Sequence, residues 1–177
     1  MQKPDASSPP ERGEPVLFLN GVSKSFPGVR ALNDVSFTLR AGEVTALVGE
    51  NGAGKSTIVK ILTGIYSPDA GEIVVGGLQR KFQSPRDSWA AGIAAIHQET
   101  VMFDELSVAE NIFMGHMPGQ KSGFVDWPQM RQRTAELLRS IDADFDPDEK
   151  LKQLSVAQKH MVEIARALGR LAARAAD

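Results

Sequence analysis

Residues 43–63 read EVTALVGENGAGKSTIVKILT, and the centre of this stretch, Gly49 to Ser56, matches the pattern G-x-x-x-x-G-K-[ST] at every fixed position. The residues before the glycines, 43–49, are almost continuously apolar, which predicts a buried parallel strand. The residues after them, 55–64, predict a helix that stops at Gly64. The stretch therefore predicts a strand, a glycine-rich turn and a helix in direct succession.

A turn of this composition predicts a site for phosphate groups. Glycines let the backbone fold around an anion with its N–H groups pointing inward, and the helix N-terminus adds the positive end of a dipole. Lys55 is expected to contact the β- and γ-phosphates, Ser56 to ligate Mg²⁺, and Thr57 to bond near the α-phosphate. The alternative is an ordinary glycine-rich turn beside a lysine, and the flanking strand and helix argue against it. The candidate nucleotide-binding residues are Gly49, Glu50, Asn51, Gly52, Ala53, Gly54, Lys55, Ser56 and Thr57.

ATP is the expected nucleotide. A GTP-binding protein with this turn would need N-K-x-D to read guanine and D-x-x-G to sense the γ-phosphate. Neither string occurs in the chain of 177 residues.

The composition excludes several other classes of protein. Hydrophobic residues make up 42% and charged residues 24%, as in an ordinary globular protein. The net charge of −2, with scattered Lys and Arg, argues against a nucleic-acid partner. The chain has no cysteine, which fits a reducing compartment. No stretch resembles a spanning helix or the apolar part of a signal peptide, so contact with a membrane is expected only through a partner.

The pattern along the chain predicts an α/β first half and a mostly helical second half. Residues 1–14 are rich in Pro, Ser and charge, which predicts a disordered tail. A short helix is predicted at 84–92, and further strands are predicted at 16–26, 35–40, 71–75 and 93–97. Capping patterns at Ser107, Asp126 and Ser155 predict three helices, the last reaching at least Leu168.

The order of these motifs resembles the ATP-binding subunit of ABC transporters, from about Leu17 to Leu168. GENGAGKST is similar to the Walker A segment of that family, and KSFPGVRALNDVSF at 24–37 is similar to its opening. The segments ENIFMG at 110–115 and FVDWPQM at 124–130 resemble the branch that imports sugars of the ribose, xylose and galactose type.

The resemblance implies roles for residues outside the glycine turn. Phe26 falls where the family stacks an aromatic ring on adenine, although Phe26 alone would be read as a core residue. Gln98 falls at the Q-loop, whose glutamine contacts Mg²⁺ and the attacking water and senses the membrane partner. LSVAQ falls at the family signature, which reaches across a dimer to the γ-phosphate on the other subunit. Val156 and Ala157 replace the two glycines of the usual LSGGQ, and the segment alone would be read as a helix cap. Its residues are Leu154, Ser155, Val156, Ala157 and Gln158.

The fold class implied is an α/β P-loop NTPase core of the ABC ATPase type with an antiparallel β subdomain and a helical subdomain, incomplete at the C-terminus. The core is expected to run to about residue 98 and the helical subdomain over about 99–168. The family's Walker B strand with its Asp-Glu pair, and its switch histidine, are missing, because the atypical tail GRLAARAAD fills 169–177. A frameshift or truncation is the preferred explanation, and a genuine helix extension is the alternative. We expect marginal stability and exposed sheet edges, since the strands around the gap lose a neighbour.

The function implied is the ATP-binding subunit of a sugar ABC importer, peripheral at the cytoplasmic face of the inner membrane. Its cofactors would be ATP and Mg²⁺. Its partners would be transmembrane permease subunits, a second ATPase domain and, indirectly, a periplasmic sugar-binding protein. The segment after Gln98, through roughly Phe113, is expected to touch the permease. One alternative is a truncated or frameshifted remnant that binds ATP weakly or not at all and does not hydrolyse it. Another is an ABC protein of DNA repair or translation, which the sugar-type segments disfavour.

Overall fold

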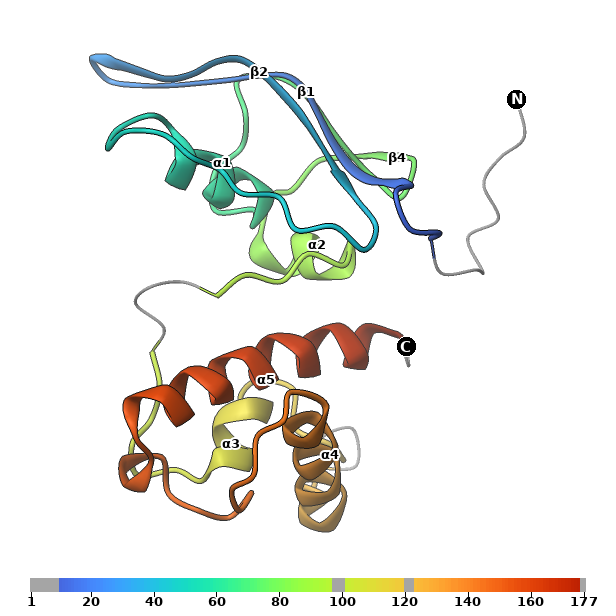
Figure 1. Ribbon diagram of the computed structural model, residues 1–177, viewed down its shortest axis with the longest axis vertical. Coiled ribbons are helices and arrows are strands. Elements are labelled where there is room, and N and C mark those ends of the chain that lie inside the picture. Colours follow the sequence, from blue (N-terminus) through green and yellow to red (C-terminus); the bar gives the residue numbers. More distant parts are fainter. Residues whose placement is uncertain (1–9, 97–100, 120–122, 176–177) are drawn as a thin grey trace. The chain divides into compact units, whose positions relative to one another are not determined.

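The computed structural model describes residues 10–96, 101–119 and 123–175. The chain divides into two compact units, Met1–Ile93 and Ala94–Asp177, and each is described by itself (Figure 1).

The first unit is built on a four-stranded antiparallel sheet with the order β2-β1-β3-β4. The central strand β1 pairs with β2 on one side and β3 on the other. A tight turn joins β1 to β2 and contains Gly28, whose φ of 80° requires a residue without a side chain. Just before β1, the N–H of Gly13 donates to the carbonyl of Ala41 (2.9 Å). The strands are β1 (Pro15–Phe26), β2 (Val29–Arg40), β3 (Ala70–Val75) and β4 (Leu78–Arg80), which confirms the strands predicted in 16–26, 35–40 and 71–75.

Two short helices cover one face of this sheet (Figure 1). They are α1 (Lys55–Leu62) and α2 (Pro85–Ala90), close to the helices predicted at 55–64 and 84–92. The apolar face of α1 is buried through Ile58 and Ile61. These side chains join the core of the unit, together with Leu17, Leu19, Val22, Leu32, Ile73, Phe82 and Ala91.

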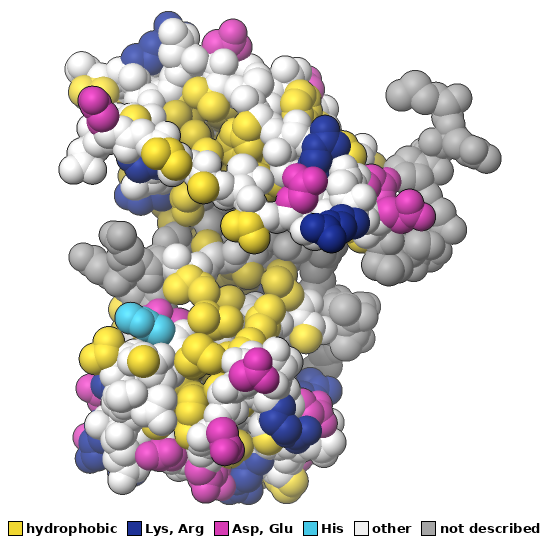
Figure 2. Space-filling model, in the orientation of Figure 1, with side chains coloured by type: hydrophobic (Ala, Val, Ile, Leu, Met, Phe, Trp, Pro, Cys, Tyr) yellow, Lys and Arg dark blue, Asp and Glu magenta, His cyan; other side chains and the backbone are white. Residues whose placement is uncertain are grey.

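Two predicted strands of the first half are wrong. Residues 43–49 form no strand, and Val44 and Val48 are 102% and 92% exposed. Residues 93–96 form no strand either. A parallel strand needs a neighbour that a crossover brings alongside it, and no strand in the described ranges pairs with these segments. Apolar side chains therefore reach the surface of the first unit. Figure 2 shows apolar side chains on the face of this unit that is turned to the viewer.

The second unit is helical. Within the described residues, its helices are α3 (Val108–Phe113), α4 (Trp127–Ser140), a 3-10 helix at Leu151–Gln153, and α5 (Val156–Ala175). The predicted caps of the first two are confirmed: Ser107 Oγ accepts from the N–H of Glu110 (3.2 Å), and the Asp126 carboxylate accepts from that of Gln129 (3.0 Å). Helix α5 continues past Leu168 to Ala175. The core that they share contains Val108, Ala109, Ile112, Phe113, Met130, Leu138, Ala143, Leu151, Leu154, Val162 and Ala165.

The described helices include none with both the length and the apolar character needed to cross a bilayer.

Candidate functional site

The glycine-rich turn at 49–54 leads into α1 in the first unit. Gly52 and Gly54 have φ values of 89° and 87°, in the left-handed region that favours glycine. Gly54 is also held by space, because a Cβ at this position would lie 2.6 Å from the carbonyl oxygen of Ala31 and 2.6 Å from Leu32 Cδ2. The turn therefore lies directly against the start of β2, and glycine is required at position 54 for two independent reasons.

The Lys55 ammonium group is hydrogen-bonded to the backbone of this turn. Its Nζ donates to the carbonyl oxygens of Gly49 (2.6 Å) and Glu50 (2.7 Å). Within the described part of the chain, no carboxylate forms an ion pair with Lys55. The two carbonyl groups thus fix the position of a positive charge without neutralising it, which is the arrangement that an incoming anion needs.

The N-terminus of α1 is open at the same place. Gly54 caps the helix without a side-chain hydrogen bond, so no side chain there competes for the first N–H groups. The side chain of Ser56 is exposed, and that of Thr57 is half-buried. The helix end, the turn and Lys55 together offer N–H groups and a positive charge at one place, which suits the binding of phosphate groups. The structure thus brings together the predicted residues 49–57.

Phe26 ends strand β1 and is half-buried. Its ring meets that of Tyr66 edge-on, with the ring centroids 5.1 Å apart and an interplanar angle of 65°. Lys24 Nζ lies 5.7 Å from the centroid of the Phe26 ring. The phenylalanine is therefore set in a small cluster of aromatic and cationic groups at the edge of the core.

The β1–β2 hairpin places Phe26 and the glycine turn at the same end. Phe26 pairs with Val29, two residues before Ala31, whose carbonyl lies against Gly54. The role of Phe26 beside the phosphate site stays a prediction. Gln98, the other residue predicted to join this site, lies outside the described residues.

The signature residues lie in the second unit, at the start of α5. The N–H and Oγ of Ser155 both donate to Gln158 Oε1 (2.9 and 2.8 Å), and the N–H of Gln158 donates to Ser155 Oγ (3.3 Å). Leu154 is buried, Val156 is 71% exposed, and Ala157 is exposed. The segment therefore forms a capping box that orders the N-terminus of a long helix.

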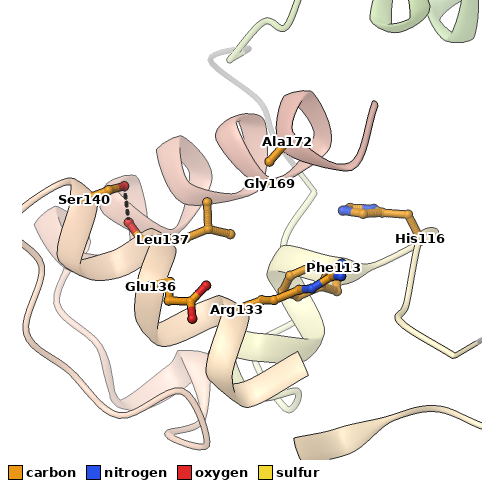
Figure 3. Close-up of a pocket in the computed structure, with 8 residues that line it drawn as sticks. All are labelled: Phe113, His116, Arg133, Glu136, Leu137, Ser140, Gly169 and Ala172. Carbon is orange, nitrogen blue, oxygen red and sulfur yellow. Dashed lines mark hydrogen bonds between the residues drawn. The ribbon is translucent and has the colours of Figure 1, made fainter. Parts of the chain in front are cut away.

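A pocket of about 330 Å³ opens between α3, α4 and α5 (Figure 3). The ring of His116 lies 5.4 Å from that of Phe113. His116 Nε2 is buried without a hydrogen-bond partner. Burial lowers the pKa of His116, and the positive charge of Arg170 lowers it further. Figure 3 also shows Ser140 Oγ donating to the carbonyl of Leu137 (2.7 Å). The lining residues are Phe113, His116, Arg133, Glu136, Leu137, Ser140, Gly169 and Ala172.

Sequence reasoning missed two residues that contact the end of strand β1. Tyr66 contacts Phe26, and Asp69 accepts from Lys24 Nζ (2.7 Å). The pairing of Lys24 with Asp69, 45 positions apart, has no counterpart in a local pattern.

The glycine turn, the lysine and the open helix end define a P-loop nucleotide-binding protein. A family model described as "ABC transporter" matches residues 32–172. The chain therefore belongs to the ABC transporter family, which confirms the family and the fold class predicted from the sequence.

Individual relatives point to one branch of the family. The chain is 59% identical to the ribose import ATP-binding protein RbsA 1 of Rhizobium meliloti (strain 1021), covering 88% of this chain and 31% of that protein. It is 49% identical to the arabinose import ATP-binding protein AraG of Pectobacterium atrosepticum, covering 88% of this chain and 31% of that protein. The chain thus spans about a third of the length of the curated relatives that it matches.

Solved structures agree with the fold. A nucleotide-free ATP-binding cassette from an ABC transporter matches with a TM-score of 0.75 and 27% identity, covering 88% of this chain and 65% of that chain. The ADP conformation of an ATP-binding cassette matches with a TM-score of 0.74, also at 27% identity, covering 88% of this chain and 65% of that chain.

Proposed function

We propose that this chain is the ATP-binding part of a sugar-importing ABC transporter subunit and that it binds Mg-ATP at residues 49–57. The observation that carries the proposal is the position of Lys55, whose charge is fixed over the glycine turn beside the open N-terminus of α1. The names of the relatives, which import ribose and arabinose, support sugar as the transported class. The sugar itself would be selected by other subunits.

Within this proposal, the N–H groups of residues 49–54 and the Lys55 ammonium bind the phosphates, and Thr57 bonds near the α-phosphate. Phe26 stacks on adenine. Mg²⁺ prefers oxygen ligands and shares them with the nucleotide phosphates, and the exposed hydroxyl of Ser56 at the helix end fits that chemistry. Gln98 is proposed as a further contact to the metal and the attacking water. When bound, the metal would supply charge to offset that of the phosphates.

The signature segment at 154–158 is proposed to contact the γ-phosphate on a second ATPase domain. The capping box supports this role, because the N-terminus of α5 combines a hydroxyl with oriented N–H groups. The permease is proposed to dock on the second unit through the segment that leads to Phe113. The pocket beside Phe113 and His116 supports this, since it offers an apolar recess between three helices. These contacts would hold the chain at the cytoplasmic face of the inner membrane, with a periplasmic sugar-binding protein as an indirect partner.

For the 177-residue chain alone we propose ATP binding without turnover. This proposal concerns residues 1–177 by themselves, because the chain spans about a third of the length of its curated relatives. A second candidate function is a chain that does not bind nucleotide at all. It is favoured by the exposure of residues 43–49, which lead into the glycine turn.

Calorimetric titration with Mg-ATP tests the proposal. Charge-assisted hydrogen bonds contribute about 1.5–3 kcal/mol, so Lys55→Ala should weaken binding by about 10-fold to 100-fold. Lys81→Ala is the matched control, because it removes the same charge from an exposed site between β4 and α2. Its affinity should stay within about twofold of wild type.

Other outcomes separate the candidates. No binding by the wild-type chain would establish the second candidate. Equal affinities for wild type and Lys55→Ala would contradict the assignment of Lys55. Steady phosphate release that Lys55→Ala abolishes would contradict binding without turnover.

A further inference from the structure

Four residues form a continuous cluster between the end of strand β1 and the C-terminal end of α1. Lys24 Nζ lies 5.7 Å from the centroid of the Phe26 ring, that ring meets Tyr66 edge-on, and Lys60 Nζ lies 5.4 Å from the centroid of the Tyr66 ring. Edge-on aromatic pairs hold their partners at a defined angle as well as burying surface. The contact with Tyr66 therefore fixes the orientation of the Phe26 ring.

The end of strand β1 is fixed by a second set of contacts. Asp69 accepts from Lys24 Nζ (2.7 Å) with one carboxylate oxygen and from the N–H of Ser25 (2.7 Å) with the other. The N–H of Asp69 donates in turn to the carbonyl of Ser23 (2.9 Å). Three successive residues before Phe26 are thus bound by one side chain and its backbone, so the ring has a rigid base.

Tyr66 is itself tied to the C-terminus of α1. Its N–H and that of Ile65 donate to the carbonyl of Lys60 (3.1 and 2.8 Å). The turn that follows α1 depends on Gly64, whose φ is 72° and at which a Cβ would collide with the carbonyl of Ser84. The helix that presents its N-terminus to the phosphates therefore ends in the tyrosine that holds Phe26.

We infer that Tyr66 is a positioning residue for the nucleobase, acting through Phe26, with Asp69 fixing the strand that carries the ring. This rests on the proposed function, since it assigns the base to Phe26. Stacking accepts any base, because every base has a π-face. The pair thus governs how tightly the base is held, whereas the phosphates are bound by the glycine turn and Lys55.

The test compares ATP with inorganic tripolyphosphate, which carries the phosphates alone. An aromatic pair contributes about 0.5–1.5 kcal/mol, so Tyr66→Ala should weaken ATP binding by about 2-fold to 10-fold. Tripolyphosphate affinity should be unchanged, which also shows that the variant is folded. Tyr66→Phe keeps the ring and should bind ATP like wild type. A merely structural role for Tyr66 would weaken both ligands together and would overturn the inference.

A spectroscopic measurement that leaves Tyr66 in place gives a second test. Because Tyr66 is the single tyrosine, 3-fluorotyrosine labels this site alone and gives one ¹⁹F resonance. ATP should shift this resonance and tripolyphosphate should not, and Phe26→Ala should remove the shift. If ATP binds in a Lys55-dependent manner and the resonance stays in place, the inference fails and the proposed function stands. If neither ligand binds the wild-type chain, both are overturned.

Discussion

Strand β1 and residues 43–49 are both apolar in sequence and lie in the same unit, yet they have opposite environments. Strand β1 pairs on both sides, and Leu19 and Val22 are fully buried. Residues 43–49 join no strand, and Val44 and Val48 stand in solvent. The difference comes from whether a pairing strand is present and not from the amino-acid composition, because both segments have strong strand character.

One of the two partners of β1 is supplied by a hairpin. Strand β2 follows after a two-residue turn, and β3 pairs antiparallel on the other side. A parallel strand depends on a neighbour from a distant part of a chain, which costs more loop-closure entropy and gives no local signal. The glycine turn nevertheless keeps its form, since Gly54 lies against β2 and Lys55 bonds to the carbonyls of Gly49 and Glu50. The candidate phosphate site therefore packs against the antiparallel hairpin.

The largest expected contrast between the two regions is in amide hydrogen exchange. The N–H groups of β1 are bonded within the sheet and should exchange at least about a hundredfold more slowly than those of residues 44–48. Exchange measured by NMR at single-residue resolution checks this. Protection across 44–48 that rises with protein concentration would show that these residues pair with a second copy.

Core truncation should separate the same regions by several kcal/mol. Leu19→Ala removes a fully buried side chain from β1 and should lower the free energy of unfolding by about 2–5 kcal/mol. Val48→Ala removes an exposed one and should change that free energy by less than about 0.5 kcal/mol. Urea unfolding followed by circular dichroism measures both. A large loss for Val48→Ala would mean that residues 43–49 are packed in solution.

The fold could be predicted from the sequence wherever the signal is local. Strands in hairpins and helices with caps at Ser107 and Asp126 follow from residues a few positions apart. The failure of residues 43–49 and 93–96 to form strands could not be predicted, because an apolar run indicates that a segment tends to be buried and does not say against what. The marginal stability expected from the sequence stays a prediction.

The residues of the candidate site also divide into those that a local sequence pattern predicts and those that it does not. The glycine turn, Lys55 and Ser56 are contiguous in sequence, so one pattern predicts them together. The roles of Phe26, Gln98 and residues 154–158 came from the family resemblance and stay predictions. Tyr66 and Asp69 could not be predicted, since their contacts with β1 span more than 35 positions of the sequence and depend on how β3 pairs.

The smallest expected effect concerns the Asp69 carboxylate, which accepts hydrogen bonds from Lys24 and Ser25 and so anchors the end of β1. Residues 43–49 have no equivalent anchor among the described contacts. The hydrogen bond from Lys24 lowers the pKa of Asp69 below its ordinary value of 3.8, and the N–H of Ser25 lowers it further. A carboxylate with a lowered pKa stabilises the fold at every pH above its unfolded value. This contribution is lost as the pH falls through the folded-state pKa, below about pH 4.

Asp69→Asn should therefore reduce stability at neutral pH, and its difference from wild type should shrink as the solution is acidified below pH 4. The effect is small because the carboxylate is exposed and its ion pair is screened by solvent. Glu72→Gln is the matched control, since it neutralises an exposed carboxylate on β3 outside this anchor. Urea unfolding at a series of pH values gives both curves. A difference for Asp69→Asn that grows in acid would show that the carboxylate does not hold β1 in the folded state.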